Sequence, residues 1–138
     1  MAKKFSLGKN ERLKSRKLIE QLFNEGKVLF IPPYRISYLQ KSINIDQGIP
    51  VLQFGIGVSS KNFKKAVDRN RVKRLTREAF RLQKTELLKK LEQKGLQLNI
   101  FFVYTSNQLP DFNTVRDKLN VILNKLILLI DENSSSNT

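Results

Sequence analysis

Apolar residues along the chain recur at two spacings, one typical of helices and one typical of strands. Helical spacing marks the stretches 15–25, 63–90 and 114–130. Alternating or continuous apolar runs mark strands at 34–40, 51–58 and 98–104. The resulting order, α-β-β-α-β-α, predicts a small α/β (α+β) sandwich.

Local signals set the ends of these elements. Ser15 is the expected N-cap of the first helix, and Ile31–Pro33 forces an extended segment after it. Gly95 ends the second helix. Thr114, with Asp117 three residues later, has the spacing of a capping box and predicts the start of the last helix.

The two faces of the predicted strands differ in character. In the first strand, Tyr34, Ile36 and Tyr38 share one face and alternate with more polar neighbours. In the second strand, Gly55 and Gly57 leave one face without side chains. A helix or a ligand can approach closely at that face.

Length and composition predict one domain. The chain has 138 residues, of which 40% are hydrophobic, and this is enough to bury a core. We expect a single domain over residues 1–130, which includes a flexible basic N-terminus at residues 1–11, and a disordered tail at residues 131–138. The absence of cysteine excludes disulfides and thiol chemistry.

The charge balance predicts a polyanionic partner. The chain carries 26 Lys and Arg against 12 Asp and Glu, with a net charge of +14 and a pI of about 10.3. A pI above about 9 is typical of nucleic-acid-binding domains, and an anionic membrane surface is a weaker alternative. No apolar run approaches the ~20 residues of a membrane span, and the polar N-terminus does not resemble a signal peptide. We expect a cytoplasmic protein that binds no membrane.

The residue inventory argues against an active site made of protein alone. The chain has no His, which removes the commonest general acid or base and the commonest metal ligand. The acidic residues are scattered, with no D-x-D or E-x-x-E pair. We therefore predict no catalytic residue and no metal-ligand set, and Asp68 alone is thin support for a magnesium site.

Residues 61–81 concentrate the positive charge. They hold nine basic and two acidic residues, a net charge of +7 and half of the total. On a helix, Val72, Leu75, Ala79 and Leu82 fall within an arc of about 80°, and most of the cations fall opposite, with Phe80 among them. The predicted nucleic-acid contacts are Lys61, Lys64, Lys65, Arg69, Asn70, Arg71, Lys73, Arg74, Arg77 and Arg81.

Ordinary solvated helix faces interleave acids at i+4 with the basic residues. Here the cationic face contains one acid, Glu78. It is also dominated by arginine, whose planar fork matches phosphate and stacks on bases. Nucleic-acid binding is therefore favoured over a merely solvated surface.

The amino-acid sequence around this segment resembles that of a known protein family. Phe54–Ser59 reads FGIGVS, Lys61 follows, and Ala66–Phe80 reads AVDRNRVKRLTREAF. This run, with its Arg-Asn-Arg core, is similar to the bacterial ribonuclease P protein subunit. Leu22-Phe23-x-x-Gly26 and the last strand and helix stand in the family's order, so the resemblance spans nearly the whole chain.

The resemblance implies a fold like domain 2 of ribosomal protein S5, with a left-handed β-α-β crossover. It implies a ribonucleoprotein endoribonuclease whose catalytic RNA uses magnesium ions to remove the 5′ leader of precursor tRNA, and no protein partner is required. The helix from Arg69 to Arg77 would face the catalytic RNA. Ile19, Phe23 and Tyr38 would line a cleft for the single-stranded leader, although Ile19 stands where many members have an aromatic residue.

Two departures from the family's pattern are expected to reduce the positive charge around this cleft. Ser60 and Tyr104 stand where the family often has a lysine and an arginine, and Lys64 and Lys65 can compensate. Three alternatives stay open at this point. The chain could be a structural RNA-binding protein such as a ribosomal or assembly factor, a protein-only nuclease, or a duplex-DNA-binding protein without a helix-turn-helix signal.

Overall fold

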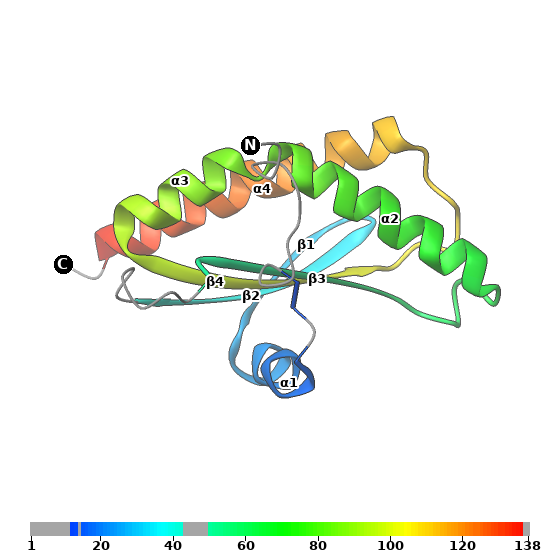
Figure 1. Ribbon diagram of the computed structural model, residues 1–138, viewed down its shortest axis with the longest axis horizontal. Helices are drawn as coiled ribbons and strands as arrows, with labels where there is room; N and C mark the ends of the chain where they lie inside the picture. The colour runs from blue at the N-terminus through cyan, green and yellow to red at the C-terminus, as the bar shows by residue number, and fades with distance from the viewer. Residues whose placement is uncertain (1–11, 14, 43–49, 137–138) are drawn as a thin grey trace.

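The computed structural model describes residues 12–13, 15–42 and 50–136, with side chains up to residue 131 (Figure 1). The elements of this part of the chain are α1 (Arg16–Glu25), β1 (Lys27–Ile31), β2 (Tyr34–Ser42), β3 (Leu52–Val58), α2 (Ala66–Gln83), α3 (Thr85–Lys94), β4 (Leu96–Tyr104) and α4 (Phe112–Ser136). The predicted flexible N-terminus at residues 1–11 lies outside the described residues. The mixed α+β class is confirmed.

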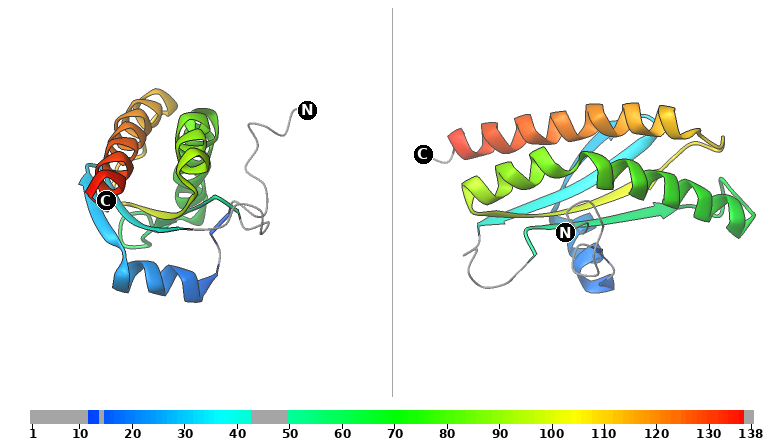
Figure 2. Two further views of the ribbon diagram at one scale, coloured as in Figure 1. Left: turned by 90° about the vertical axis from the view of Figure 1, so that its left-hand side faces the viewer. Right: turned by 45° about the horizontal axis from the view of Figure 1, so that its top comes forward.

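The four strands form one sheet in the order β1-β2-β4-β3. β1 and β4 both run antiparallel to β2, whereas β3 and β4 are parallel neighbours joined through α2 and α3. Seen from the helix layer with β3 pointing up, β4 lies to its left, so the crossover is left-handed (Figures 1 and 2). This is the rarer hand for a parallel crossover.

The two faces of the sheet are covered differently. α2, α3 and α4 cover one face, and α1 is the one described helix that crosses the other (Figures 1 and 2). Alternation along the strands turns Ile36, Phe54 and Phe102 toward the three-helix layer, where all three are buried. The residues between them face α1, and this face is only partly covered.

The ends of α1 agree with the sequence. The Ser15 hydroxyl accepts from the Leu18 amide at 3.4 Å, and the Gly26 amide donates to the Leu22 carbonyl. Strand β1, which directly follows, differs from the expectation of only an extended segment at Ile31–Pro33. Its five residues are too few to give a periodic signal, and their pairing with β2 stabilises them as a strand.

The second predicted helix differs from the expectation in two ways: it forms two helices, and it is rotated about its own axis. It breaks at Lys84 into α2 and α3, and Gly95, with φ 64°, ends α3 in the left-handed region that favours glycine. Phe80, expected in the cationic arc, is fully buried and stacks on Phe54 with ring centroids 4.0 Å apart. Leu82, expected in the buried stripe, is 45% exposed.

Burial of Phe80 fixes the rotation of α2 about its axis. The helix buries a stripe centred between Val72 and Phe80, where Thr76 also lies. The Thr76 hydroxyl donates to the Val72 carbonyl at 2.9 Å and accepts from the Tyr34 hydroxyl at 2.7 Å. Burial raises the pKa of Tyr34 to about 12, so it remains a neutral donor that ties α2 to β2.

The last helix is longer than the pattern indicates. α4 begins at Phe112, and its cap is Asp111, whose carboxylate accepts from the Thr114 amide at 2.8 Å. The predicted capping box of Thr114 and Asp117 is therefore wrong. α4 continues to Ser136, through residues predicted as a disordered tail. None of the helices in the described ranges is long and apolar enough to cross a membrane.

Candidate nucleic-acid interface

The outer face of α2 and the loop before it form a continuous cationic surface, named here the α2 face. Most of its predicted contacts are exposed to solvent. These are Lys61, Lys64, Lys65, Asn70, Arg71, Arg74 and Arg77. Since exposed cations on one helix face can reach successive phosphates, the α2 face has the form of an RNA-binding surface.

Arg69 has a different role from its neighbours. The rotation of α2 leaves this side chain half-buried, and its Nη1 donates to the carbonyls of Phe63 at 2.7 Å and Lys64 at 3.0 Å. Phe63 is itself buried against Tyr104. Arg69 therefore holds the loop before α2 in place, which positions the cations of that loop.

We expect Arg69→Ala to lower the free energy of unfolding by about 1–2 kcal/mol, because two charge-assisted hydrogen bonds at a half-exposed site are lost. Urea denaturation measures this change. Arg71→Ala, two residues along α2 and on its exposed side, is the matched control and should leave the urea midpoint unchanged. If both variants are as stable as the wild type, Arg69 does not anchor the loop.

Lys73 and Arg81 are also half-buried. Arg81 forms an ion pair with Glu78 on the same helix, and its Nε donates to the Glu78 carboxylate at 3.2 Å. This hydrogen bond raises the pKa of Arg81. A guanidinium already paired with a carboxylate attracts phosphate less strongly, so Arg71 and Arg74 carry more of the charge that the α2 face offers.

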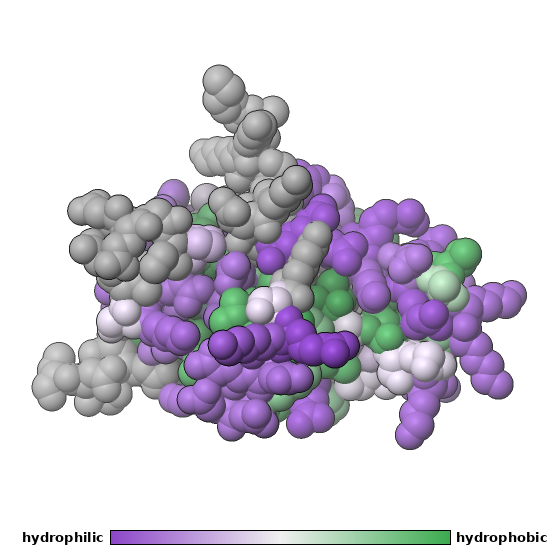
Figure 3. Space-filling model, turned by 60° about the horizontal axis from the view of Figure 1, so that its bottom comes forward, coloured by the Kyte–Doolittle hydropathy of each residue, from purple (hydrophilic) through white to green (hydrophobic). Residues whose placement is uncertain are grey.

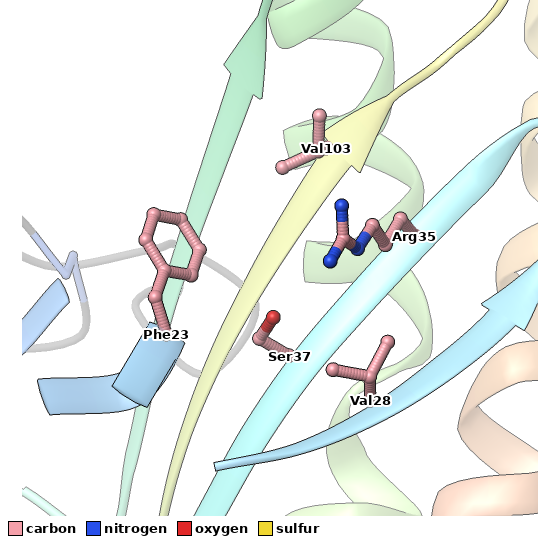
Figure 4. Close-up of a pocket in the computed structure, with 5 residues that line it drawn as sticks. All are labelled: Phe23, Val28, Arg35, Ser37 and Val103. Atoms are coloured by element: carbon pink, nitrogen blue, oxygen red, sulfur yellow. The ribbon is translucent and has the colours of Figure 1, made fainter. Parts of the chain in front are cut away.

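A hollow lies on the other side of the sheet, beside α1. It has a volume of about 260 Å³ and is lined by Phe23, Val28, Arg35, Ser37 and Val103. In Figure 4, the Phe23 ring and the Arg35 guanidinium lie on opposite sides of this space, with Ser37 between them. This space is named here the α1 hollow. An aromatic ring, a guanidinium and a hydroxyl around one space suit a nucleobase and its phosphate.

A second hollow of about 290 Å³ adjoins α1 at β3. Its lining residues are Arg12, Leu13, Ile19, Phe54, Gly55, Ile56, Arg77 and Phe101. Phe101 connects the two spaces, because its ring meets Phe23 edge-on at 5.6 Å between centroids. A Cβ at Gly55 would lie 2.6 Å from the Phe101 ring, so the glycine lets this ring pack against β3.

Two guanidiniums lie close together at the second hollow. Partial burial of its guanidinium lowers the pKa of Arg77, and the charge of Arg12 lowers it further. Among the described residues, neither side chain forms an ion pair with a carboxylate. The hydrogen bond from the Leu13 amide to the Phe54 carbonyl, at 2.8 Å, fixes the segment that carries Arg12. Adjacent unpaired cations attract an anion such as phosphate.

The structure corrects one predicted cleft residue. Ile19 and Phe23 line the two hollows, but Tyr38 does not. Tyr38 is 5% exposed and packs in the core beneath the three-helix layer, because it pairs across the sheet with Ile100. A shift of one residue along a strand reverses the face, and the adjacent Ser37 occupies the hollow instead.

Several hollow residues were missed by sequence reasoning. Arg35 and Ser37 stand on the strand face opposite Tyr38, so strand alternation could have identified them once α1 was placed on that face. Phe101 looked like part of an apolar central strand. Arg12 follows the basic N-terminal segment. Its position depends on a single backbone bridge to Phe54, which the sequence does not indicate.

The molecular surface on the α1 side of the sheet has both apolar and hydrophilic regions. Apolar patches lie in the recesses beside α1 and are framed by hydrophilic side chains (Figure 3). Tyr104, where the family resemblance leads us to expect an arginine, is buried and donates to the Gln108 carbonyl at 2.8 Å. Within the described part of the chain, no three His, Cys, Asp or Glu side chains gather as a metal-ligand group.

Comparisons with known proteins agree on one family. A sequence model described as Ribonuclease P matches residues 7–127. The ribonuclease P protein component of Porphyromonas gingivalis is 40% identical over 111 residues, which make up 80% of this chain and 79% of that protein. The ribonuclease P protein component of Chlorobium phaeobacteroides is 32% identical over 130 residues, or 89% of each chain.

Solved structures show the same architecture. The ribonuclease P protein from Thermotoga maritima superposes with a TM-score of 0.64 at 30% identity, covering 83% of this chain and 96% of that chain. The ribonuclease P protein of Staphylococcus aureus superposes with a TM-score of 0.65 at 20% identity, covering 84% and 94%, and is similar in fold.

Proposed function

Because the chain belongs to the ribonuclease P protein family and is a protein subunit of that endoribonuclease, we propose that it binds two RNAs at once. The α2 face binds the catalytic RNA of the enzyme. The hollows beside α1 bind the 5′ leader of precursor tRNA. Endonucleolytic removal of the leader then gives the mature 5′ end of the tRNA.

The observation that carries this proposal is the separation of the two surfaces. The α2 face lies on the three-helix side of the sheet, and the α1 hollow lies on the opposite side (Figure 1). The two meet only at the β3 edge, where Arg77 reaches the second hollow. One RNA on each side can therefore be held without competition, which a protein that positions a substrate on a catalytic RNA requires.

The chemistry of the hollows suits a leader of any sequence. An exposed ring such as Phe23 stacks on each of the four bases, and such a stack contributes about 1–3 kcal/mol. Arg35, Arg12 and Arg77 supply charge for the backbone phosphates. Because stacking and phosphate contacts carry little sequence information, one protein can serve many precursor tRNAs.

Magnesium ions would be held by the catalytic RNA. The described carboxylates do not gather into a donor set, so they do not fit a metal ion held by the protein alone. The residues of this chain bind and orient the two RNAs, and the cleavage chemistry belongs to the RNA subunit.

Reconstitution with the cognate RNA and a labelled precursor tRNA tests this division of roles. We expect the protein to lower the magnesium concentration needed for half-maximal cleavage, because the cations of the α2 face reduce the repulsion between packed RNA phosphates. Cleavage is measured across a magnesium titration with and without protein. Cleavage by RNA-free protein that survives repurification would contradict the proposal.

A further inference from the structure

Strand β1 carries two exposed apolar side chains that the core does not need. Val28 is 55% exposed and Phe30 is 59% exposed. Phe30 pairs with Arg35, and Val28 pairs with Ser37, so both lie on the sheet face beside α1. Val28 also lines the α1 hollow.

These side chains extend two rows across the sheet. One row is formed by Val103, Arg35 and Phe30, and the next by Phe101, Ser37 and Val28. Each row runs from β4 to the outer strand β1. In the second row, the β4 residue is Phe101, which contacts Phe23 of α1. The rows therefore continue the α1 hollow to the edge of the sheet without a break.

We propose that single-stranded RNA leaving the α1 hollow continues across β1, with its bases on Phe30 and Val28 and its backbone near Arg35. This inference rests on the proposed leader binding and adds a second segment to it. Two strand spacings of about 4.8 Å separate β4 from β1. At a stacked rise of ~3.4 Å, this distance accommodates at most about three nucleotides, counting those in the α1 hollow itself.

Charge favours RNA over a second copy of the chain on this surface. On this face the strands carry Arg35 and Lys41 and no acidic residue. With a net charge of +14, two copies would repel each other at this face, whereas a polyanion is attracted to it. The ring of Phe30 beside a guanidinium also matches the composition of single-strand RNA sites.

The test uses the reconstituted holoenzyme and a series of precursor tRNAs whose leaders grow one nucleotide at a time. Wild-type affinity should rise with leader length and then reach a plateau. With Phe30→Ala, we expect the plateau to come one or two nucleotides earlier and to lie about five-fold or more lower, since one base loses its stack. Phe30→Tyr keeps the ring and should restore the wild-type curve.

Matched controls separate this effect from altered folding. Val121 on α4 is 54% exposed, nearly the same fraction as Val28. Val121→Ala is therefore the control for Val28→Ala. The two substitutions remove the same atoms from exposed positions, so both variants should remain folded in a thermal unfolding experiment. Only Val28→Ala should weaken binding of the longer leaders.

The outcomes distinguish failure of the proposed leader binding from failure of its extension across β1. If affinity does not depend on leader length even in the wild type, the proposed leader binding itself is wrong. If Phe23→Ala weakens binding while Phe30→Ala and Val28→Ala keep the wild-type curve, only the extension across β1 is wrong. A dimer that Phe30→Ala dissociates in sedimentation, with an unchanged leader curve, would assign this surface to a second copy instead.

Discussion

Replacing Arg71 and Arg74 together by alanine is expected to weaken binding of the catalytic RNA roughly ten-fold or more near physiological salt. Both side chains are exposed on the α2 face and lie one turn apart. If each neutralises one phosphate, the plot of log affinity against log salt should also flatten by about 1.4–1.8. A filter-binding or fluorescence titration at several salt concentrations measures both quantities.

Charge-matched substitution on α4 is the control for this experiment. Lys118 and Lys125 lie on α4, and neither forms an ion pair among the described residues, so replacing both by alanine removes the same charge from another helix. That variant should keep the wild-type salt slope. An unchanged slope for the Arg71 and Arg74 variant, or an equal change in the control, would place the RNA surface elsewhere on the molecule.

The sequence predicted the cationic helix α2 because the relevant signal is local. Nine cations within residues 61–81 and the run Ala66–Phe80 do not depend on tertiary contacts. The rotation of α2 could not be predicted in the same way. It is set by the stacking of Phe80 on Phe54, a residue of β3, and this long-range contact draws Arg69 inward.

The lining of the α1 hollow likewise combines features that the sequence predicts with features that only the fold determines. Alternation correctly separated the two faces of β2, but it does not say which face α1 crosses, and this left Tyr38 in place of Ser37. Strand β1 has five residues and exists because β2 pairs with it. The hollow depends on that pairing and on the glycine contact beneath Phe101, so most of its lining could be known only from the fold.

Replacing Phe23 by alanine is expected to lower the affinity of the holoenzyme for precursor tRNA by about 5- to 150-fold, the range for loss of one base stack. The ring is 53% exposed, and it contacts Phe101 only edge-on. Such an aromatic contact contributes about 0.5–1.5 kcal/mol, so the variant should remain folded. Because mature tRNA has no leader, its affinity should not change.

Competition between precursor and mature tRNA measures the effect directly as a ratio of affinities. Phe23→Tyr retains a stacking ring and should retain discrimination, whereas Leu128→Ala, at a 58% exposed position on α4, controls for loss of exposed apolar surface. If Phe23→Ala weakened precursor and mature tRNA equally, the ring would support the body of the tRNA or the fold. A selective loss with precursor tRNA would mean that the sheet face that α1 only partly covers binds an unpaired strand of RNA.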